Sequence, residues 1–252
     1  MLRKFLIPVL FCACFCVANA EDNVALFAAG NHDYQNGNYG AAIDAYDKMT
    51  RNGAYSAEAY YNLGSAHQML NQPVDAVLNY RRALMLNPTL LQARRNLETI
   101  EHAKGIPMPR FTWREEITSI ILPSSLIYGG VTFAWVGGFL FVLAFLKKGP
   151  RFWWISISLV LIIIGKSSAF LGYISDPKLA YRNSAVIMAK ESVTARAVPA
   201  DSSASVTKLL PGTGVSVISK RDAWSYCKLP DNTNAWLPSK NLTMVPSGSG
   251  GG

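Results

Sequence analysis

The chain has 252 residues, half of them hydrophobic and 16% charged, and carries a formal net charge of +8. The charge is uneven: residues 21–106 sum to −2, whereas 107–174 and 175–246 each sum to +4. The basic excess therefore follows segment boundaries and gives little support for nucleic-acid binding. Cys227 is the only cysteine after Cys16, which excludes an internal disulfide framework in the remainder of the chain.

Residues 1–20 have the pattern of a secretory signal peptide. Arg3 and Lys4 precede an apolar run, Phe5–Val17, and Ala18-Asn19-Ala20 supplies a small-x-small cleavage pattern. An uncleaved anchor and lipid attachment through a cysteine of the apolar run are the alternatives. A signal peptide places the following arm outside the cytoplasm.

Residues 21–106 repeat with a period of 34. The recurring pairs are Gly30 with Gly64, Ala42 with Ala76, Ile43 with Val77 and Tyr46 with Tyr80. We predict helices over 23–36, 39–51, 57–70, 73–86 and 90–104, with the fourth ended by Pro88. The pattern resembles the tetratricopeptide repeat, which implies two helix pairs and a capping helix. We expect the charged side chains of that last helix to face solvent: Arg94, Arg95, Glu98 and Glu101.

Tetratricopeptide arrays bind extended segments of other proteins in a groove lined by the first helix of each pair. The resemblance assigns ten positions here to that groove: Phe27, Asn31, Tyr34, Tyr61, Asn62, Ser65, Gln68, Gln92, Arg95 and Asn96. A subset of the family clamps a C-terminal carboxylate, but Gln92 and Asn96 stand where that clamp has basic residues. We therefore expect an aromatic and amide-lined groove, with a merely solvated face as the alternative.

Two apolar stretches follow, Ile117–Leu146 and Phe152–Tyr173, and each exceeds the roughly 20 residues that span a bilayer as a helix. The linking residues 147–151 carry three positive charges, which places this loop in the cytoplasm and both arms on the far side. Glycine pairs at 129–130 and 137–138 predict close helix packing, either within the hairpin or on another subunit.

Lys166 is the only charge within either stretch. Two interpretations remain open for it. Its ammonium group snorkels to the outer interface, or it pairs with an acidic residue in a partner's membrane helix.

Residues 184–246 show short alternating runs broken by turn residues, which predicts a small β barrel. Leu210-Pro-Gly-Thr-Gly-Val, Trp224 with Tyr226, and Ala235-Trp236-Leu237 resemble bacterial SH3-like domains. The resemblance implies binding of proteins or cell-wall peptides, with Trp224, Tyr226 and Trp236 as surface candidates. The alternative is that Trp224 and Trp236 belong to the core. We expect Cys227 to be a buried small hydrophobic residue.

The predicted fold class is a multidomain membrane protein with an all-α repeat arm, a two-helix hairpin and a small all-β SH3-like barrel. The predicted segments are a signal peptide (1–20), repeats (21–106), the first span with its basic loop (107–151), the second span (152–175), the SH3-like domain (184–246) and a flexible tail (247–252). This order resembles the BatE family of the bacterial aerotolerance (Bat) operon.

That resemblance implies a scaffold or adaptor subunit of an inner-membrane complex, linked to envelope stress or oxygen tolerance. It implies von Willebrand A-domain membrane proteins as partners. Cell-wall (peptidoglycan) binding or sensing by the SH3-like arm is the alternative function. The sequence has no Gly-x-Ser-x-Gly motif, phosphate-binding loop or histidine-rich metal cluster, so we predict no enzyme activity and no cofactor.

Overall fold

The computed structural model describes residues 22–107, 120–146 and 151–246. The predicted signal peptide, the loop residues 147–150 and the C-terminal tail lie outside this part of the chain. The chain divides into two compact units. One contains the described parts of Met1–Leu86, Gln92–Pro109 and Asn183–Gly252, and the other contains Asn87–Leu91 and the described parts of Arg110–Arg182.

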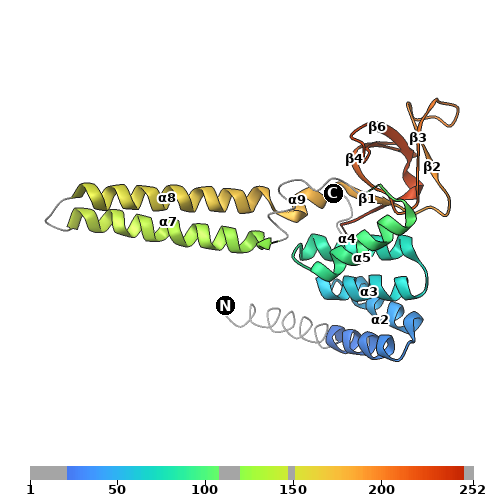
Figure 1. Cartoon of the computed structure of the whole chain (residues 1–252), viewed down its shortest axis with the longest axis horizontal. Helices are drawn as coiled ribbons and strands as arrows, with labels where there is room; N and C mark the ends of the chain where they lie inside the picture. Colours follow the sequence, from blue (N-terminus) through green and yellow to red (C-terminus); the bar gives the residue numbers. More distant parts are fainter. Residues whose placement is uncertain (1–21, 108–119, 147–150, 247–252) are drawn as a thin grey trace, which may run out of the picture. The chain divides into compact units, whose positions relative to one another are not determined.

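The N-terminal part of the first unit is a series of antiparallel helices (Figure 1). Residues 22–35 are helical. They are followed by α2 (Tyr39–Arg51), α3 (Ala57–Met69), α4 (Pro73–Leu86) and α5 (Leu91–Lys104). These bounds confirm the helices predicted from the repeat period, with only small differences at their ends.

Close helix packing in the repeats depends on glycine facing tyrosine. A Cβ atom added to Gly64 would lie 2.9 Å from the Tyr80 ring and 3.3 Å from the Ala76 carbonyl oxygen. Gly30 faces Tyr46 in the same way, one repeat earlier. Both tyrosines are fully buried, so each aromatic ring fills the space that the missing side chain leaves.

The first helix of each repeat ends with the same backbone device. Gly37, Asn71 and Gly105 follow one another at the repeat period, and all three have positive φ angles, 80°, 54° and 64°. After each of them, the next amide bonds to a carbonyl earlier in the helix, from Asn38 to Asp33, Gln72 to His67 and Ile106 to Glu101. This pattern is a Schellman-type helix end. α5 therefore terminates as the first helix of a third repeat would.

One expectation for α5 is wrong. Glu101 does not face solvent: it is 3% exposed, and one of its carboxylate oxygens accepts a hydrogen bond from Arg81 Nη2 of α4 at 2.6 Å. Arg81 is itself 6% exposed. Glu101 follows Leu97 by one helical turn and so lies on the buried side of α5. Its charge alone predicts a position at the surface. It is buried instead because Arg81, a buried cation on α4, pairs with its carboxylate.

The C-terminal part of the first unit is one seven-stranded antiparallel sheet in the order β3-β2-β6-β5-β4-β1-β7. The strands are β1 (Ser184–Ile187), β2 (Val193–Arg196), β3 (Ser205–Leu209), β4 (Gly214–Arg221), β5 (Trp224–Lys228), β6 (Asn234–Pro238) and β7 (Leu242–Met244). Alternating runs in the sequence at 185–188, 192–196, 215–219, 224–229 and 234–238 correspond to β1, β2, β4, β5 and β6, whereas β3 and β7 had no predicted run.

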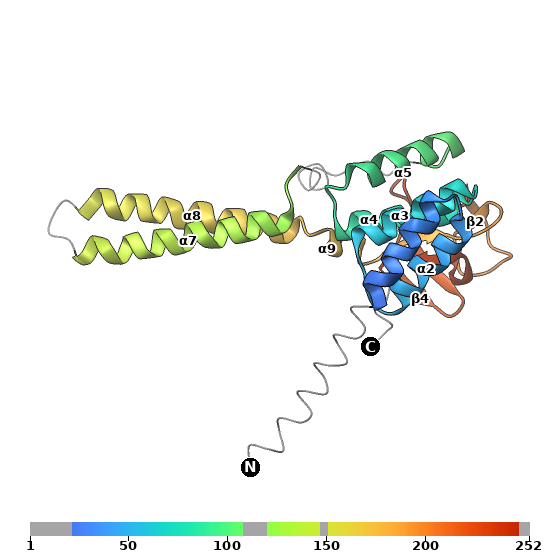
Figure 2. The same ribbon diagram turned by 90° about the horizontal axis from the view of Figure 1, so that it is seen from below.

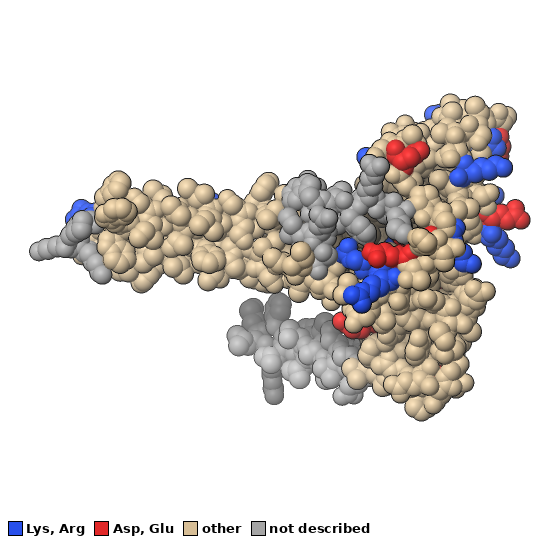
Figure 3. Space-filling model, viewed as in Figure 1, with Lys and Arg blue, Asp and Glu red and all other residues tan. Residues whose placement is uncertain are grey.

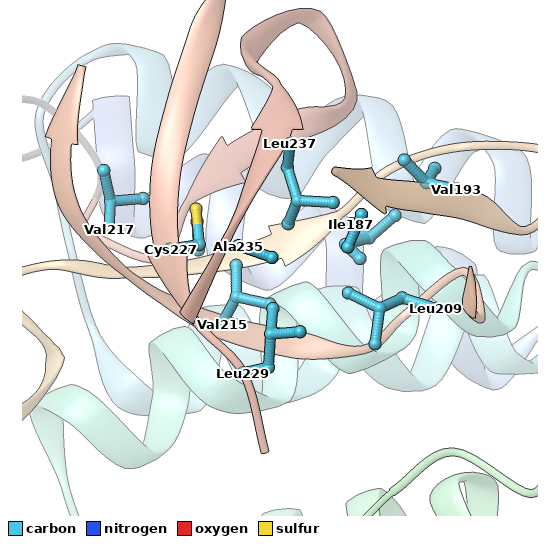
Figure 4. Packing of buried hydrophobic residues seen from close by; sticks show 11 residues of the cluster. Ile187, Val193, Leu209, Val215, Val217, Cys227, Leu229, Ala235 and Leu237 are labelled. Carbon is cyan, nitrogen blue, oxygen red and sulfur yellow. The ribbon is translucent and has the colours of Figure 1, made fainter. Parts of the chain in front are cut away.

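A single apolar cluster holds this sheet together (Figure 4). Residues from β1 to β6 all contribute to it, including Ile187, Val215 and Leu237, and Leu242 and Met244 of β7 pack against it. A flat sheet could not bring so many strands to one cluster, so the sheet curls around this core. Cys227 lies within the cluster and is fully buried, which confirms its predicted role.

The repeats and the sheet contact each other within the first unit. Val186 is fully buried, although its neighbours Ala185 and Ile187 fill the sheet core and its own side chain must point to the opposite face. β1 contacts α4, and the Arg81 guanidinium lies against Gly214. Gly212 lies against Ile106 and Val77. One face of the sheet is therefore partly covered by repeat helices.

The second unit contains two long apolar helices, α7 (Pro123–Leu146) and α8 (Arg151–Ile174), which run side by side (Figures 1 and 2). α7 begins at Pro123, later than the apolar stretch suggested, because proline suits the first turn of a helix. After α8, Asp176 caps the short α9 (Pro177–Tyr181) by accepting the Lys178 amide.

Both helices of this hairpin are long and apolar enough to cross a membrane, and little of their surface is buried. Neither contains an acidic residue, and no Asp or Glu shows over the hairpin in Figure 3. Lys166 is exposed on α8.

Small residues at seven-residue intervals form the seam of the hairpin. The buried residues are Pro123, Gly130, Gly137 and Ala144 on α7 and Ser158, Gly165 and Gly172 on α8. A Cβ atom on Gly130 would lie 2.5 Å from the Gly165 carbonyl oxygen, and Ser168 Oγ donates to the Leu126 carbonyl at 3.0 Å. Gly129 and Gly138, by contrast, face open space. Of the four glycines in the two predicted pairs, close packing within the hairpin thus accounts for Gly130 and Gly137 but not for Gly129 and Gly138.

Candidate functional site: the repeat groove and the outer face of the sheet

Two hydrogen-bonded networks, one per repeat, organise the predicted groove. In the first, Tyr46 donates its hydroxyl hydrogen to Asn31 Oδ1 at 2.7 Å, and Asn62 Nδ2 donates to the same oxygen at 2.9 Å. Asn62 comes from the next repeat. This network therefore joins side chains from consecutive units through one acceptor.

The second network is centred on Tyr80, which occupies the position of Tyr46 one repeat later. Its hydroxyl donates to Gln68 Oε1 at 2.7 Å, accepts from Asn96 Nδ2 at 3.1 Å and lies 3.2 Å from Ser65 Oγ. Asn96 in turn follows Asn62 by one repeat period. Burial raises the pKa of both tyrosine hydroxyls above the ordinary value, so both remain neutral donors.

Aromatic rings line the same region. Tyr61 packs on Tyr80 with ring centroids 5.9 Å apart, and Phe27 packs on Tyr46 at 6.1 Å. Tyr34 meets Tyr39 edge to face at 5.3 Å. Phe27, Tyr34 and Tyr61 are only half-buried, so each ring keeps part of its surface accessible.

The structure brings eight of the ten predicted groove residues into these networks and ring contacts. Gln92 and Arg95 are the exceptions: both are exposed, and within the described residues no hydrogen bond joins them to either network. Arg95 instead borders a shallow hollow on α5 with Glu98, Thr99 and His102. The sequence analysis did not assign Tyr46 and Tyr80 a role beneath the groove, although both are buried and their hydroxyls bond to predicted lining residues. Their spacing at the repeat period was the available signal.

The predicted aromatic residues of the sheet lie outside its core. Along β5 and β6 the buried residues are Ser225, Cys227, Ala235 and Leu237, and these alternate with half-buried Trp224, Tyr226 and Trp236. Tyr226 and Trp236 are cross-strand partners with ring centroids 5.0 Å apart. The side chains of Trp224 and Trp236 therefore lie outside the buried cluster of the sheet.

The tetratricopeptide repeat family model matches residues 57–90, which comprise α3, α4 and the turn that follows them. No curated protein matches the chain. The matched segment contains four of the predicted groove residues, Tyr61, Asn62, Ser65 and Gln68, together with the buried Tyr80. Tetratricopeptide repeats are protein-interaction modules without catalytic chemistry of their own. The chain thus carries a protein-binding repeat and, C-terminal to it, two helices that could span a membrane.

The described residues include no group of three or more His, Cys, Asp or Glu side chains that could hold a metal ion. Burial raises the pKa of the Cys227 thiol to about 12. A thiol with that pKa is almost wholly protonated at neutral pH and is not a nucleophile.

Proposed function

We propose that this protein is a non-enzymatic scaffold of a bacterial inner membrane, which binds partner proteins through the repeat groove. The observation that carries the proposal is the pair of tyrosine-centred networks with half-buried aromatic rings around them. The networks fix the groove side chains in place, and preorganised side chains lose little conformational entropy on binding. The rings supply the kind of surface on which interface energy concentrates.

In the proposed topology α7 and α8 both cross the membrane, the basic loop between them is cytoplasmic, and both arms are periplasmic. Contacts between the repeats and the sheet support this arrangement. Arg82 bonds to the Val245 carbonyl and Arg81 lies against Gly214, and these contacts fit a topology with both arms on one side of the membrane. If both arms lie on one side, the chain between them must cross the membrane an even number of times, as the two helices α7 and α8 would.

The order of segments resembles the BatE family, and on that resemblance we propose partners with von Willebrand A domains and a role in envelope stress or oxygen tolerance. An ion pair between Lys166 and an acidic residue in a partner's span would fit this assembly. Snorkelling of Lys166 remains the alternative for that residue.

Copurification from gently solubilised membranes tests the groove. Tyr61→Ala combined with Gln92→Ala removes one half-buried ring and one exposed amide of the predicted groove without breaking the hydrogen bonds of either network. Tyr55→Ala removes the same aromatic side chain from a site outside the groove-lining residues, and serves as the matched control. Loss of a membrane partner in the groove variant but not in the control supports the proposal. Equal recovery with all three proteins contradicts it.

Cysteine labelling of intact spheroplasts tests the topology. Asp201→Cys places a thiol in the exposed β2–β3 connection, and Lys148→Cys places one in the basic loop. A membrane-impermeant maleimide should label the first, which the proposed topology makes periplasmic, and not the second, which it makes cytoplasmic. Cys227 should add no background because it is buried. The opposite labelling pattern would reverse the proposed orientation.

A second candidate function is peptidoglycan binding by the C-terminal sheet acting as an SH3-like domain. The observation that favours it is the position of Trp224, Tyr226 and Trp236 on the outer face. Sedimentation of the full chain with purified sacculi, compared with Trp236→Ala, tests it. Failure to sediment would remove this candidate.

A further inference from the structure

The outer face of the sheet has two regions that differ in what covers them. Over β1 and the start of β4, repeat helices cover it: Val186 is fully buried there and Gly214 lies against Arg81. Over β5 and β6, no described segment buries the rings of Trp224, Tyr226 and Trp236 fully. We call this second region, together with the basic residues beside it, the aromatic–basic face.

Strand register places basic side chains around these rings. Arg196 pairs with Trp236 across β2 and β6, and Arg221 pairs with Trp224 across β4 and β5. Lys228 is the next residue but one after Tyr226 and so lies on the same side of β5. Arg196 is held in place because its Nη1 donates to the Ser203 carbonyl at 2.7 Å.

The charged side chains of the strands are all basic. The seven strands contain five Lys or Arg side chains, namely Arg196, Lys208, Lys220, Arg221 and Lys228, and no Asp or Glu. The acidic residues of this part of the chain lie in the connections, and the described residues show no ion pair between them and the strand cations. Asp231 is engaged locally, because its carboxylate accepts from the Thr233 amide and hydroxyl.

We infer that the aromatic–basic face binds an extended, acidic segment of a partner protein. Rings at positions i and i+2 of a strand are spaced like alternate side chains of an extended peptide. Arginine and lysine beside them can pair with carboxylates, and arginine can do so through two parallel hydrogen bonds. Protein interfaces commonly have aromatic side chains at the centre and charged or polar side chains around them.

The chemistry of this face favours a protein segment over the glycan of the cell wall. Sugar hydroxyls need acceptors as well as donors, and the charged side chains of the strands are donors only. The face is separate from the repeat groove. The inference therefore does not depend on the proposed groove function, and the scaffold would have two distinct protein-binding surfaces.

The test uses the full chain in detergent and a fluorescein-labelled oligoglutamate peptide, followed by fluorescence anisotropy. Arg221→Gln combined with Lys228→Gln removes two charges from the face. Lys190→Gln combined with Lys240→Gln removes two charges elsewhere on the same domain, and is the matched control. We expect about tenfold weaker binding, equivalent to about 1.4 kcal/mol, in the first variant and little change in the control.

The rings are tested separately with Trp236→Ala and Trp236→Tyr, each checked for an unchanged melting temperature. We expect loss of binding with alanine and its retention with tyrosine, which keeps an aromatic surface. The inference is overturned if the peptide does not bind, if both charge variants weaken binding equally, or if the face variants instead abolish binding to sacculi or anionic vesicles while peptide binding is unaffected.

Discussion

Arg82 of α4 donates a hydrogen bond from Nε to the backbone carbonyl oxygen of Val245, 3.2 Å away and on the far side of the hairpin in sequence. The same guanidinium lies 5.7 Å from the centre of the Tyr60 ring, so it is held from the repeat side as well. The two residues before Arg82 contact other parts of the unit. The Tyr80 hydroxyl bonds to Gln68 in the second network, and Arg81 bonds to Glu101 and lies against Gly214. Three consecutive residues of α4 thus contact the groove, α5 and the sheet.

Removing the charge of Glu101 should destabilise the first unit strongly. Glu101→Gln leaves the Arg81 guanidinium buried without a counter-charge, which costs about 3–5 kcal/mol. Glu98→Gln on the same helix should change the free energy of unfolding by no more than about 0.5 kcal/mol. Chemical denaturation of the full chain in detergent measures both.

The combined variant Arg81→Met with Glu101→Leu separates the charge effect from packing. Burial raises the pKa of the Glu101 carboxyl although Arg81 opposes this, so ionising this carboxyl in its buried site is costly. We expect the apolar pair to recover most of the lost stability, as buried ion pairs often allow. A double variant as unstable as Glu101→Gln would contradict this explanation.

The two tyrosine hydroxyls should differ in their contribution to stability. Tyr80→Phe leaves Gln68 and Asn96 without their shared partner, whereas Tyr46→Phe removes one hydrogen bond to Asn31, which keeps its bond to Asn62. Each lost bond is worth about 0.5–1.5 kcal/mol. Chemical denaturation should therefore show a larger fall in unfolding free energy for Tyr80→Phe, and equal losses would count against the network.

Adjacent glycines of α7 should respond differently to the same substitution. Gly130→Val places a side chain against the backbone of α8, so the helices must separate. Gly129→Val faces open space and serves as the control. In detergent, the thermal melting temperature should fall by several degrees for Gly130→Val alone, because overpacking costs about 1–3 kcal/mol. Equal effects would show that the seam does not hold the hairpin.

Cys227 should report unfolding of the sheet. Burial raises its pKa to about 12, against 9.0 for the unshifted thiol, so at pH 8 the folded protein should resist alkylation. Between pH 9 and 12 the unfolded chain loses a proton that the folded chain keeps, and the stability of the sheet should fall as pH rises through that range. Rapid labelling of the folded protein at pH 8 would rule out this environment.

Most helices could be predicted from the sequence because their signals are local. The repeat period, the small residues at its helix crossings and Pro88 define α2 to α5, and uninterrupted apolar runs define α7 and α8. The strands were harder. β3 buries only Leu209 fully and therefore lacks a clear alternation, and β7 is very short.

The site was predictable only where it follows the repeat. Asn31, Asn62 and Asn96 could be identified by position, but the roles of Tyr46 and Tyr80 depend on which way each hydroxyl points. The burial of Glu101 depends on a cation on the preceding helix, and no local pattern reveals such a partner. The contact between repeats and sheet joins residues separated by the whole hairpin, so the sequence alone could not predict it.

The α7–α8 hairpin is an insertion within a folded unit, since residues on both sides of it belong to that unit. During synthesis the repeats emerge first but must wait for the strands before Arg82 can meet Val245. Until then, the surface of α4 that later contacts β1 is open to water or to a chaperone. Final docking of the two arms can thus take place only after the whole hairpin has been made.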